Sequence, residues 1–298
     1  MNTGQSLAFQ GAAAVETRKS TWARVRFVLT EAFFYALLSA IAVLTVLPLA
    51  WMVSTSLKEP SQVAAVPPVW IPDPLRWENY GEAWNHAPFW LFFTNTIYVA
   101  FTVVAGTLFT SSLAGYAFAR LQFVGRDFVF SIFLSTMMIP GIVFLIPQYV
   151  IFRTIGWIDT HLPLLIPPMM FSAFNIFLLR QFFKTLPQEL EDAARIDGCS
   201  TFGIYWKIML PQVGPALATV GIFSFFGTWN NFLGPLIYIN SIEKQLLSVG
   251  LALFRTEVGV ETNLLMAAAT FTTAPLLIVY FFAQKYFIQG ITLTGIKG

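Results

Sequence analysis

Six stretches of this chain are long, apolar and free of Asp, Glu, Lys, Arg and His, and they constrain its fold more than any other feature. They cover residues 32–53, 89–113, 128–151, 162–179, 213–239 and 264–283. A helix that crosses the hydrocarbon core of a bilayer needs roughly 20 mainly apolar residues. Only 11% of the 298 residues are charged, whereas soluble domains carry about 25%. The sequence therefore predicts an all-α membrane protein with six transmembrane helices.

The fourth apolar stretch is the least regular of the six. It is short and contains Pro163, Pro167 and Pro168. Helices inside a membrane bundle tolerate proline, because neighbouring groups satisfy the carbonyls that the proline leaves free. We therefore expect a fourth spanning helix here, and a re-entrant segment is the alternative.

The first apolar stretch reads as a membrane span and not as a cleaved signal. It is 22 residues long, whereas the apolar region of a secretory signal has roughly 7–15 residues. No small-x-small cleavage site follows it, and four basic residues precede it: Arg18, Lys19, Arg24 and Arg26. This arrangement predicts a first span whose N-terminus stays in the cytoplasm.

Basic residues are unequally distributed between the two sides that the spans define. With the N-terminus inside, 12 of the 17 Lys and Arg residues fall in inner segments. Cytoplasmic loops of membrane proteins carry such an excess. The sequence therefore places both termini of a multi-pass protein in the cytoplasm. Arg180 lies at the end of a span, where we expect its long side chain to extend into water.

The chain lacks the motifs of several functional classes. It has no Gly-Lys dipeptide, and therefore no Walker A phosphate loop, and it has no G-x-G-x-x-G, G-x-S-x-G or H-E-x-x-H,. Its two histidines are far apart in the sequence, and a net charge of +2 gives no sign of nucleic-acid binding,. Proton-coupled transporters and intramembrane enzymes need ionisable groups at membrane depth. We therefore expect no catalytic residue and no metal site, and we expect a partner that binds ATP.

The predicted organisation has three parts. A cytoplasmic N-terminal tail covers 1–31, a transmembrane domain covers 32–288, and a C-terminal tail covers 289–298. Two loops in the domain are long: an outer loop at 54–88, rich in Pro and Trp, and an inner loop at 184–212. A single cysteine, Cys199, excludes an internal disulfide,.

The inner loop has the pattern of two short helices joined by a turn. Gly198 suits the C-terminal cap of the first helix,, and Ser200 suits the N-terminal cap of the second,. Three small or apolar residues fall at i, i+3 and i+4 on one narrow face of the first helix: Leu190, Ala193 and Ala194,. By composition alone, this pattern favours an amphipathic loop packed against the inner ends of the spans.

The same loop carries a motif with fixed spacing. The run 192–194 reads Asp-Ala-Ala, Gly198 follows after three residues, and after nine more the run 208–211 reads Ile-Met-Leu-Pro. This pattern resembles the EAA motif, the cytoplasmic coupling loop of binding-protein-dependent ABC importer permeases. Asp192 stands where that family usually has Glu, so the acid is kept but is one methylene shorter. Glu191 is adjacent, but it points about 100° away on a helix and is a poor substitute.

The resemblance extends beyond the motif. The segments 119–126, 138–140, 178–183, 229–232 and 295–298 look like the carbohydrate-uptake branch of this family, the maltose-type inner-membrane permease subunits. The resemblance covers nearly all of the chain from the first span onward. Asn231 stands where that branch commonly has Asp, so the role of that acid does not transfer to this chain.

The resemblance implies a type I ABC importer permease fold and a set of partners. Two such permeases pair around a central path, two cytoplasmic ATPase subunits bind ATP and Mg²⁺, and an extracytoplasmic binding protein delivers the substrate. This chain would bind no cofactor, would not be catalytic, and would lie in the cytoplasmic (inner) membrane of a bacterium or archaeon. Its ATPase-coupling residues would be Asp192, Ala193, Ala194, Gly198, Ile208, Leu210 and Pro211.

A path for sugars needs neutral hydrogen-bonding groups and aromatic faces. Candidate residues in or near the spans are Asn95, Gln148, Asn175, Trp229, Asn230 and Asn231. For each of them the alternative is a hydrogen bond to a neighbouring helix. We expect the permease subunit of an ATP-driven sugar importer. The alternatives are an importer permease for another solute, such as glycerol phosphate or an amino acid, an independent secondary transporter, and a membrane-embedded enzyme.

Overall fold

The computed structural model describes residues 3–170, 172–256 and 259–295, and most of them are helical. The α-helices are α1 (Thr3–Ser56), α2 (Pro60–Val63), α3 (Glu78–Asn85), α4 (Phe89–Arg120), α5 (Arg126–Thr136), α6 (Leu145–Thr154), α7 (Leu162–Met170), α8 (Ala173–Thr185), α9 (Glu189–Ile196), α10 (Thr201–Ile204), α11 (Leu210–Gln212), α12 (Gly214–Trp229), α13 (Leu233–Tyr238), α14 (Leu247–Gly250) and α15 (Thr262–Gly295). Short 3₁₀ turns are η1 (Gly141–Phe144), η3 (Ile242–Lys244) and η4 (Leu251–Phe254), and η2 (Tyr205–Met209) is a π-turn. Strands β1 (Arg255–Thr256) and β2 (Gly259–Val260) form an antiparallel pair in which Arg255 faces Val260.

Within the described residues, four helical segments are long and apolar enough to cross a membrane. They are Arg26–Ser56, Phe89–Arg120, Leu162–Thr185 and Thr262–Gln284, and the third is α7 and α8 on either side of residue 171. Two bent pairs of helices bring the number to six, if each pair is one span. This arrangement confirms the predicted all-α membrane fold and the fourth apolar stretch as a span-length segment.

The third and fifth predicted spans differ from the continuous helices that the sequence predicted. The third is α5 followed by η1 and α6, with a bend of 93° at residues 137–140, where Pro140 lacks the N–H that would continue the helix,. The fifth consists of α12, which ends at Trp229, and α13, with an irregular stretch between them. α12 is also bent by 81° from the preceding segment Thr201–Gln212. Hydropathy depends on composition alone, so it does not predict where a helix breaks.

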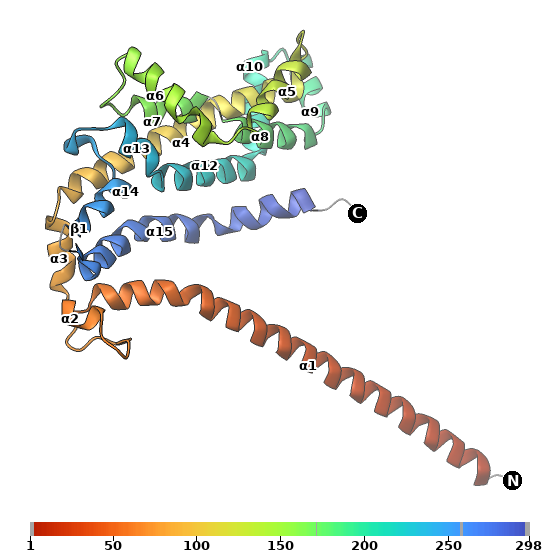
Figure 1. Cartoon of the computed structure of the whole chain (residues 1–298). Helices are drawn as coiled ribbons and strands as arrows, with labels where there is room; N and C mark the ends of the chain where they lie inside the picture. Colours follow the sequence, from red (N-terminus) through yellow and green to blue (C-terminus); the bar gives the residue numbers. More distant parts are fainter. Residues whose placement is uncertain (1–2, 171, 257–258, 296–298) are drawn as a thin grey trace.

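The central part of the molecule is a bundle in which α4 packs against α7, α8 and α12, and α15 packs against α12 and α1. α1 extends away from this bundle (Figure 1), and most of its apolar side chains between residues 27 and 47 are exposed. α1 begins at Thr3, within the predicted N-terminal tail, and α15 continues to Gly295, within the predicted C-terminal tail. Residues 1–2 and 296–298 of those tails lie outside the described residues.

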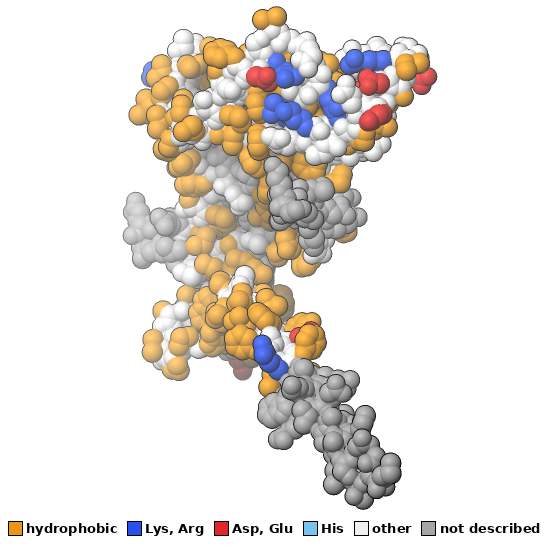
Figure 2. Space-filling view, turned by 90° about the vertical axis from the view of Figure 1, so that its right-hand side faces the viewer, with side chains coloured by type: hydrophobic (Ala, Val, Ile, Leu, Met, Phe, Trp, Pro, Cys, Tyr) orange, Lys and Arg blue, Asp and Glu red, His pale blue; other side chains and the backbone are white. Residues whose placement is uncertain are grey.

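Both ends of the bundle carry charged residues. Figure 1 places α5, α9 and α10 together at one end, and α2, α3 and β1 at the other. Figure 2 shows Lys, Arg, Asp and Glu side chains gathered at the first end. The other end contains the ion pair of Arg76 and Glu82, at 2.7 Å. Charged residues at the two ends of the helices suit a bundle whose ends meet water.

A buried network joins α1 to α3 and α15 at the other end. The Asn79 amide donates to the carbonyls of Ser56 (2.9 Å) and Lys58 (2.8 Å), and it accepts from the Asn263 amide at 3.3 Å. The Lys58 side chain is buried: its ammonium donates to Thr55 Oγ1 at 3.2 Å and lies 3.5 Å from the centre of the Trp51 ring. Burial lowers the pKa of Lys58,. The predicted outer loop is therefore attached to the bundle by buried polar contacts.

A second set of polar contacts, centred on Asp159, joins the loop before α7 to the segment that follows α13. Its carboxylate accepts from the Asn240 N–H (3.0 Å), the Ser241 N–H (2.8 Å) and the Ser241 hydroxyl (2.6 Å), and it pairs with Lys244 at 2.9 Å. These donors, the Ser241 hydroxyl first, hold the pKa of Asp159 well below its usual range,. Asp159 has a φ of +60°, a left-handed conformation that aspartate tolerates better than most residues,.

The expectation that the Arg180 side chain extends into water is wrong. This side chain is buried. Its Nε donates to the Phe118 carbonyl at 3.2 Å, and its guanidinium lies 3.9 Å from the centre of the Phe130 ring. Contacts within the protein replace water because α4 and α5 cover this side of α8.

Candidate functional site

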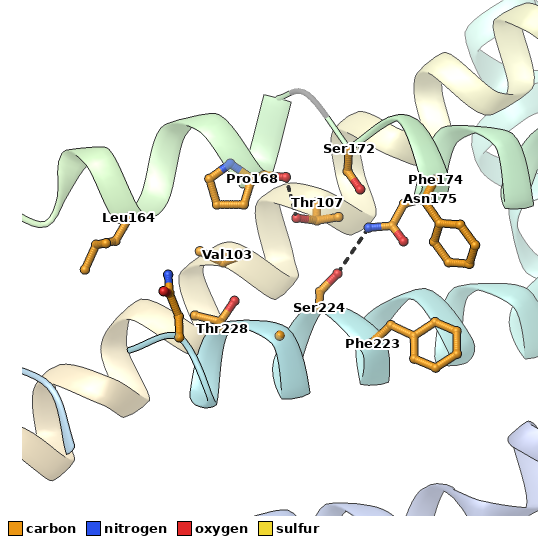
Figure 3. A pocket seen from close by; sticks show the side chains of 12 residues that line it. Val103, Thr107, Leu164, Pro168, Ser172, Phe174, Asn175, Phe223, Ser224 and Thr228 are labelled. Atoms are coloured by element: carbon orange, nitrogen blue, oxygen red, sulfur yellow. Dashed lines mark hydrogen bonds between the residues drawn. The ribbon is translucent and has the colours of Figure 1, made fainter. Parts of the chain in front are cut away.

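A cavity of about 440 Å³ lies between α4, α7, α8 and α12 (Figure 3). Its lining contains hydroxyls, two side-chain amides and two phenyl rings, and none of the lining residues is charged. A volume of this size fits a small organic ligand. The lining residues are Val103, Thr107, Leu164, Pro168, Ser172, Phe174, Asn175, Phe223, Ser224, Gly227, Thr228 and Asn231.

Proline shapes one wall of this cavity. α7 contains Pro167 and Pro168 and ends at Met170, and the last carbonyls of a helix have no intrahelical donor,. The Thr107 hydroxyl of α4 donates to the Pro168 carbonyl at 3.2 Å, and the Thr110 hydroxyl donates to the Met169 carbonyl. Neighbouring hydroxyls therefore satisfy the broken span, as membrane proteins require. The break also lets side chains from α8 reach the cavity.

Two of the predicted path residues line the cavity. Asn175 is 7% exposed, and its amide points toward Ser224 of α12, to whose hydroxyl it donates at 3.4 Å (Figure 3). The Asn231 carbonyl oxygen of the side chain accepts from the Gly234 N–H at 3.0 Å, which fixes the chain where α12 gives way to α13. Both amides therefore combine a structural contact with a position on the cavity wall.

The other four predicted path residues lie outside the cavity lining. Asn95 donates to the carbonyls of Glu243 (2.8 Å) and Gln245 (3.1 Å), and Gln148 accepts from the Tyr238 hydroxyl at 3.3 Å. Asn230 donates to the Phe226 carbonyl of its own helix at 2.9 Å. Trp229 is 2% exposed, stacks on Phe225 and donates to the Thr272 carbonyl of α15 at 3.0 Å. Trp229 and Gln148 therefore bond a neighbouring helix, which was the alternative for these residues, whereas Asn95 bonds a turn and Asn230 bonds its own helix.

The inner loop folds as the predicted helix-turn-helix. α9 ends in a Schellman motif: Gly198 has a φ of +79°, its N–H donates to the Arg195 carbonyl at 3.0 Å, and the Cys199 N–H donates to the Ala194 carbonyl at 2.9 Å,. The Ser200 hydroxyl caps α10 by accepting from the Gly203 N–H at 3.2 Å,. Both cap predictions are confirmed. After α10 the second helix becomes the π-turn η2 and then α11.

The faces of α9 differ from the prediction. Of the three residues predicted to share one face, only Ala194 is buried, whereas Leu190 and Ala193 are exposed. The second buried residue of α9 is Glu191, whose side chain is 4% exposed. Residues three apart lie on the same face of a helix, so Glu191 and Ala194 form one buried face, and this face carries an acid. Asp192 and Ala193 form the outer surface.

The remaining coupling candidates lie in and after the second helix. Ile208 and Leu210 are partly buried and pack against the cluster that contains Tyr116, Phe183, Ala194 and Met209. Pro211 is exposed and lies in the three-residue helix α11. This cluster joins the helix-turn-helix to the ends of α4 and α8.

Two residues in contact with each other, Arg120 and Glu191, were not among the sequence candidates. Arg120, the last residue of α4, lies 3.3 Å from Glu191 Oε1 through its Nε. Burial raises the pKa of the Glu191 carboxyl, and the charges of Arg120 and Arg195 act in the opposite direction,. Arg195 is the second partner of Glu191, at 3.7 Å. The sequence shows only two signs of this contact: Glu191 is adjacent to the Asp-Ala-Ala run, and Arg120 lies near the end of a span.

A family model described as "Binding-protein-dependent transport system inner membrane component" matches residues 106–293. The chain belongs to this family. The matched range contains α9, α10 and every cavity-lining residue except Val103. This permease is therefore an inner-membrane component of a binding-protein-dependent transport system.

Curated relatives cover most of the permease. The arabinooligosaccharides transport system permease protein of Halalkalibacterium halodurans is 34% identical over 87% of this chain and 93% of its own. The sulfoquinovosyl glycerol transport system permease protein of Agrobacterium fabrum is 31% identical over 84% of this chain and 88% of its own. The diacetylchitobiose uptake system permease protein NgcG of Streptomyces coelicolor is 29% identical over 85% of each.

A solved structure has the same fold. It is a chain of a bacterial ABC transporter involved in the import of the acidic polysaccharide alginate. The permease superposes on it with a TM-score of 0.77 and 26% identity, over 87% of this chain and 96% of that chain. This match confirms the predicted ABC importer permease fold.

Proposed function

We propose that this permease forms one half of the translocation path of an ATP-driven importer for neutral oligosaccharides. The observation that supports this most is the uncharged cavity between α4, α7, α8 and α12. Sugars bind through hydroxyl and amide hydrogen bonds and through apolar ring faces. The cavity supplies both, with Asn175, Ser224 and Thr228 beside Phe174 and Phe223. The names of two relatives, the arabinooligosaccharides and the diacetylchitobiose permeases, agree with this substrate class. The third relative is named for sulfoquinovosyl glycerol, which carries a sulfonate, so it agrees only with a sugar-containing substrate.

The coupling part of the proposal concerns α9. Its outer surface presents an acid, Asp192, beside the small residue Ala193, which together suit close docking on a separate ATPase subunit that binds ATP and Mg²⁺. A second permease, a second ATPase subunit and an extracytoplasmic binding protein complete the assembly. In this arrangement α9, α10 and both termini face the cytoplasm, in agreement with the excess of basic residues in the inner segments,.

Uptake measurements test the substrate class. The assembled transporter in proteoliposomes should take up a labelled neutral oligosaccharide only with ATP inside, and an acidic oligosaccharide or glycerol phosphate should compete weakly. Asn175→Ala should raise the KM for uptake roughly 3- to 10-fold, because one hydrogen bond in the site is lost. Asn230→Ala is the matched control, since this exposed amide bonds only its own helix. Equal effects of both variants would contradict the assignment of the cavity.

Crosslinking tests the coupling surface. In a Cys199→Ser background, which removes the exposed native thiol, Ala193→Cys should crosslink to an ATPase subunit in inverted vesicles, to an extent that changes with ATP. Ala194→Cys is the control, because Ala194 is only 4% exposed and its thiol should stay unreacted. Uptake without ATP, together with no ATPase crosslink at position 193, would instead identify an independent secondary transporter.

A further inference from the structure

The guanidinium of Arg120 contacts three elements at once. Arg120 is the last residue of α4. Its Nε and Nη2 donate to the Phe183 carbonyl near the end of α8, at 3.0 and 2.7 Å, and Nη2 also donates to the Leu186 carbonyl just after α8. Its Nε also lies 3.3 Å from Glu191 Oε1 of α9. This is a contact between charges without a hydrogen bond, because the Nε–H is donated to Phe183 and Glu191 Oε1 has no donor. The side chains of Arg120 and Glu191 are only 11% and 4% exposed.

Through these contacts the Arg120 side chain joins three helices at one junction. The last carbonyls of a helix have no intrahelical donor, and a basic side chain is a suitable partner for them. Arginine fits several acceptors simultaneously, because its five N–H donors lie in one rigid plane. α4, α8 and α9 are therefore joined by a charged group that is shielded from water, so that salt screens it little. Arg195, the other partner of Glu191, is 56% exposed and lies on α9 itself, so it joins no further element.

The joined elements lead to the cavity. α4 contributes Val103 and Thr107 to the cavity wall, and α8 contributes Phe174 and Asn175. Thr107 lies 13 residues before Arg120, which is about 20 Å along a helix, and Asn175 lies about 12 Å before Phe183. α9, in contrast, carries Asp192 and Ala193 on its outer surface. The junction therefore lies between the proposed ATPase-docking surface and two walls of the proposed substrate cavity.

We propose that the Arg120–Glu191 ion pair is a transmission link: it makes α4 and α8 follow the movement of α9, so that a displacement at the ATPase changes the shape of the cavity. The proposal rests on the proposed function and deepens it. Arg120 and Glu191 are positioning residues, because they contact neither the cavity lining nor the exposed outer surface of α9. The apolar cluster around Tyr116, Phe183 and Tyr205 surrounds the same junction, and packing of that cluster alone is the competing explanation for any transmission.

The test separates coupling from stability by removing both charges. Removing one member of a buried ion pair leaves an unpaired buried charge and endangers folding, whereas removing both is usually tolerated. The key variant is therefore Arg120→Gln with Glu191→Gln, next to Glu191→Gln alone. Each is assembled with its partner subunits in proteoliposomes. Sugar uptake and ATP hydrolysis are then measured in the same vesicles and expressed as substrate moved per ATP hydrolysed.

We expect the double variant to assemble, to keep the ATPase crosslink at Ala193→Cys and to keep its ATP hydrolysis, but to move roughly 2- to 30-fold less substrate per ATP. Glu191→Gln alone should lower this ratio by a similar factor, so that the further change Arg120→Gln lowers it little more. Glu189→Gln is the control and should leave the ratio unchanged, because Glu189 is an exposed acid of the same helix.

Three results would overturn the proposal. An unchanged ratio in the double variant would show that apolar packing transmits the movement. Loss of the crosslink at position 193 would show that the pair only shapes the docking surface. A wild-type chain that shows no ATPase crosslink and no ATP-dependent uptake would refute the proposed function, and the transmission link with it. The first two results leave the proposed function intact, so the two failures are distinguishable.

Discussion

Replacement of Gly115 by alanine tests how closely the helices around the cavity are packed. Gly115 lies in α4 where it meets α8, and a Cβ at this position would lie 2.9 Å from Leu179 Cβ and 3.1 Å from Arg180 N. Carbon atoms pack at about 3.5–4.0 Å, so the helices must separate by roughly 0.6–1.1 Å. The obstacle is a main chain and a Cβ, so a rotamer change cannot relieve it. Overpacking of this kind costs about 1–3 kcal/mol, and the better helix propensity of alanine offsets up to about 1 kcal/mol.

We therefore expect Gly115→Ala to lower the free energy of unfolding by about 1–2 kcal/mol. Thermal unfolding of the purified permease, followed by tryptophan fluorescence, should show a Tm lower by roughly 2–8 °C. Gly221→Ala in α12 is the matched control, because its added Cβ would meet only Leu108 and Val104 side-chain atoms at 3.7 Å or more. Identical melting of the two variants would refute the argument that α4 and α8 touch at Gly115.

Three further substitutions test single contacts. Trp229→Phe removes the indole donor to the Thr272 carbonyl and should cost about 1 kcal/mol of unfolding free energy in a thermal melt. Ser200→Ala removes the cap of α10 and should cost about 0.5–2 kcal/mol locally, seen as faster amide exchange at Gly203. Because the pKa of Asp159 is depressed in the folded protein, its contacts stabilise the loop above the unfolded pKa and are lost as pH falls below it,. Loop protection in the wild type should therefore decrease in acid, and Asp159→Asn should abolish that pH dependence.

Membrane insertion was predictable from the sequence because it depends on composition. Long runs without charged residues can be stable only in hydrocarbon or in a protein core, and their length gives their number. The direction of each helix was less predictable. The bends at Pro140 and before α12 depend on which neighbours satisfy the free carbonyls,. Those neighbours, such as Thr107 at the Pro168 carbonyl, come from distant parts of the chain.

The sequence predicted which kinds of residue line the cavity, but not which individual residues do. An amide in a span must find a partner, and the sequence does not show whether that partner is a helix or a substrate. Asn175 and Asn231 lie on the cavity wall, whereas the amide of Asn95 donates to two loop carbonyls about 150 residues later in the chain,. The turn of the inner loop, in contrast, was predictable in detail, because Gly198 and Ser200 act on residues within five positions of themselves.

The two adjacent acids of α9 show how one helix can serve two surfaces. Successive residues of a helix point about 100° apart, so Asp192 is directed outward while Glu191 is directed inward to Arg120. An acid buried against apolar residues is costly unless it is paired, and the raised pKa of Glu191 records that cost. Arg120 is already committed to two carbonyls of α8 and its end, so the pairing adds α9 to a contact that exists without it. The shorter side chain at Asp192 alters only the outward surface, and it leaves this inner connection unchanged.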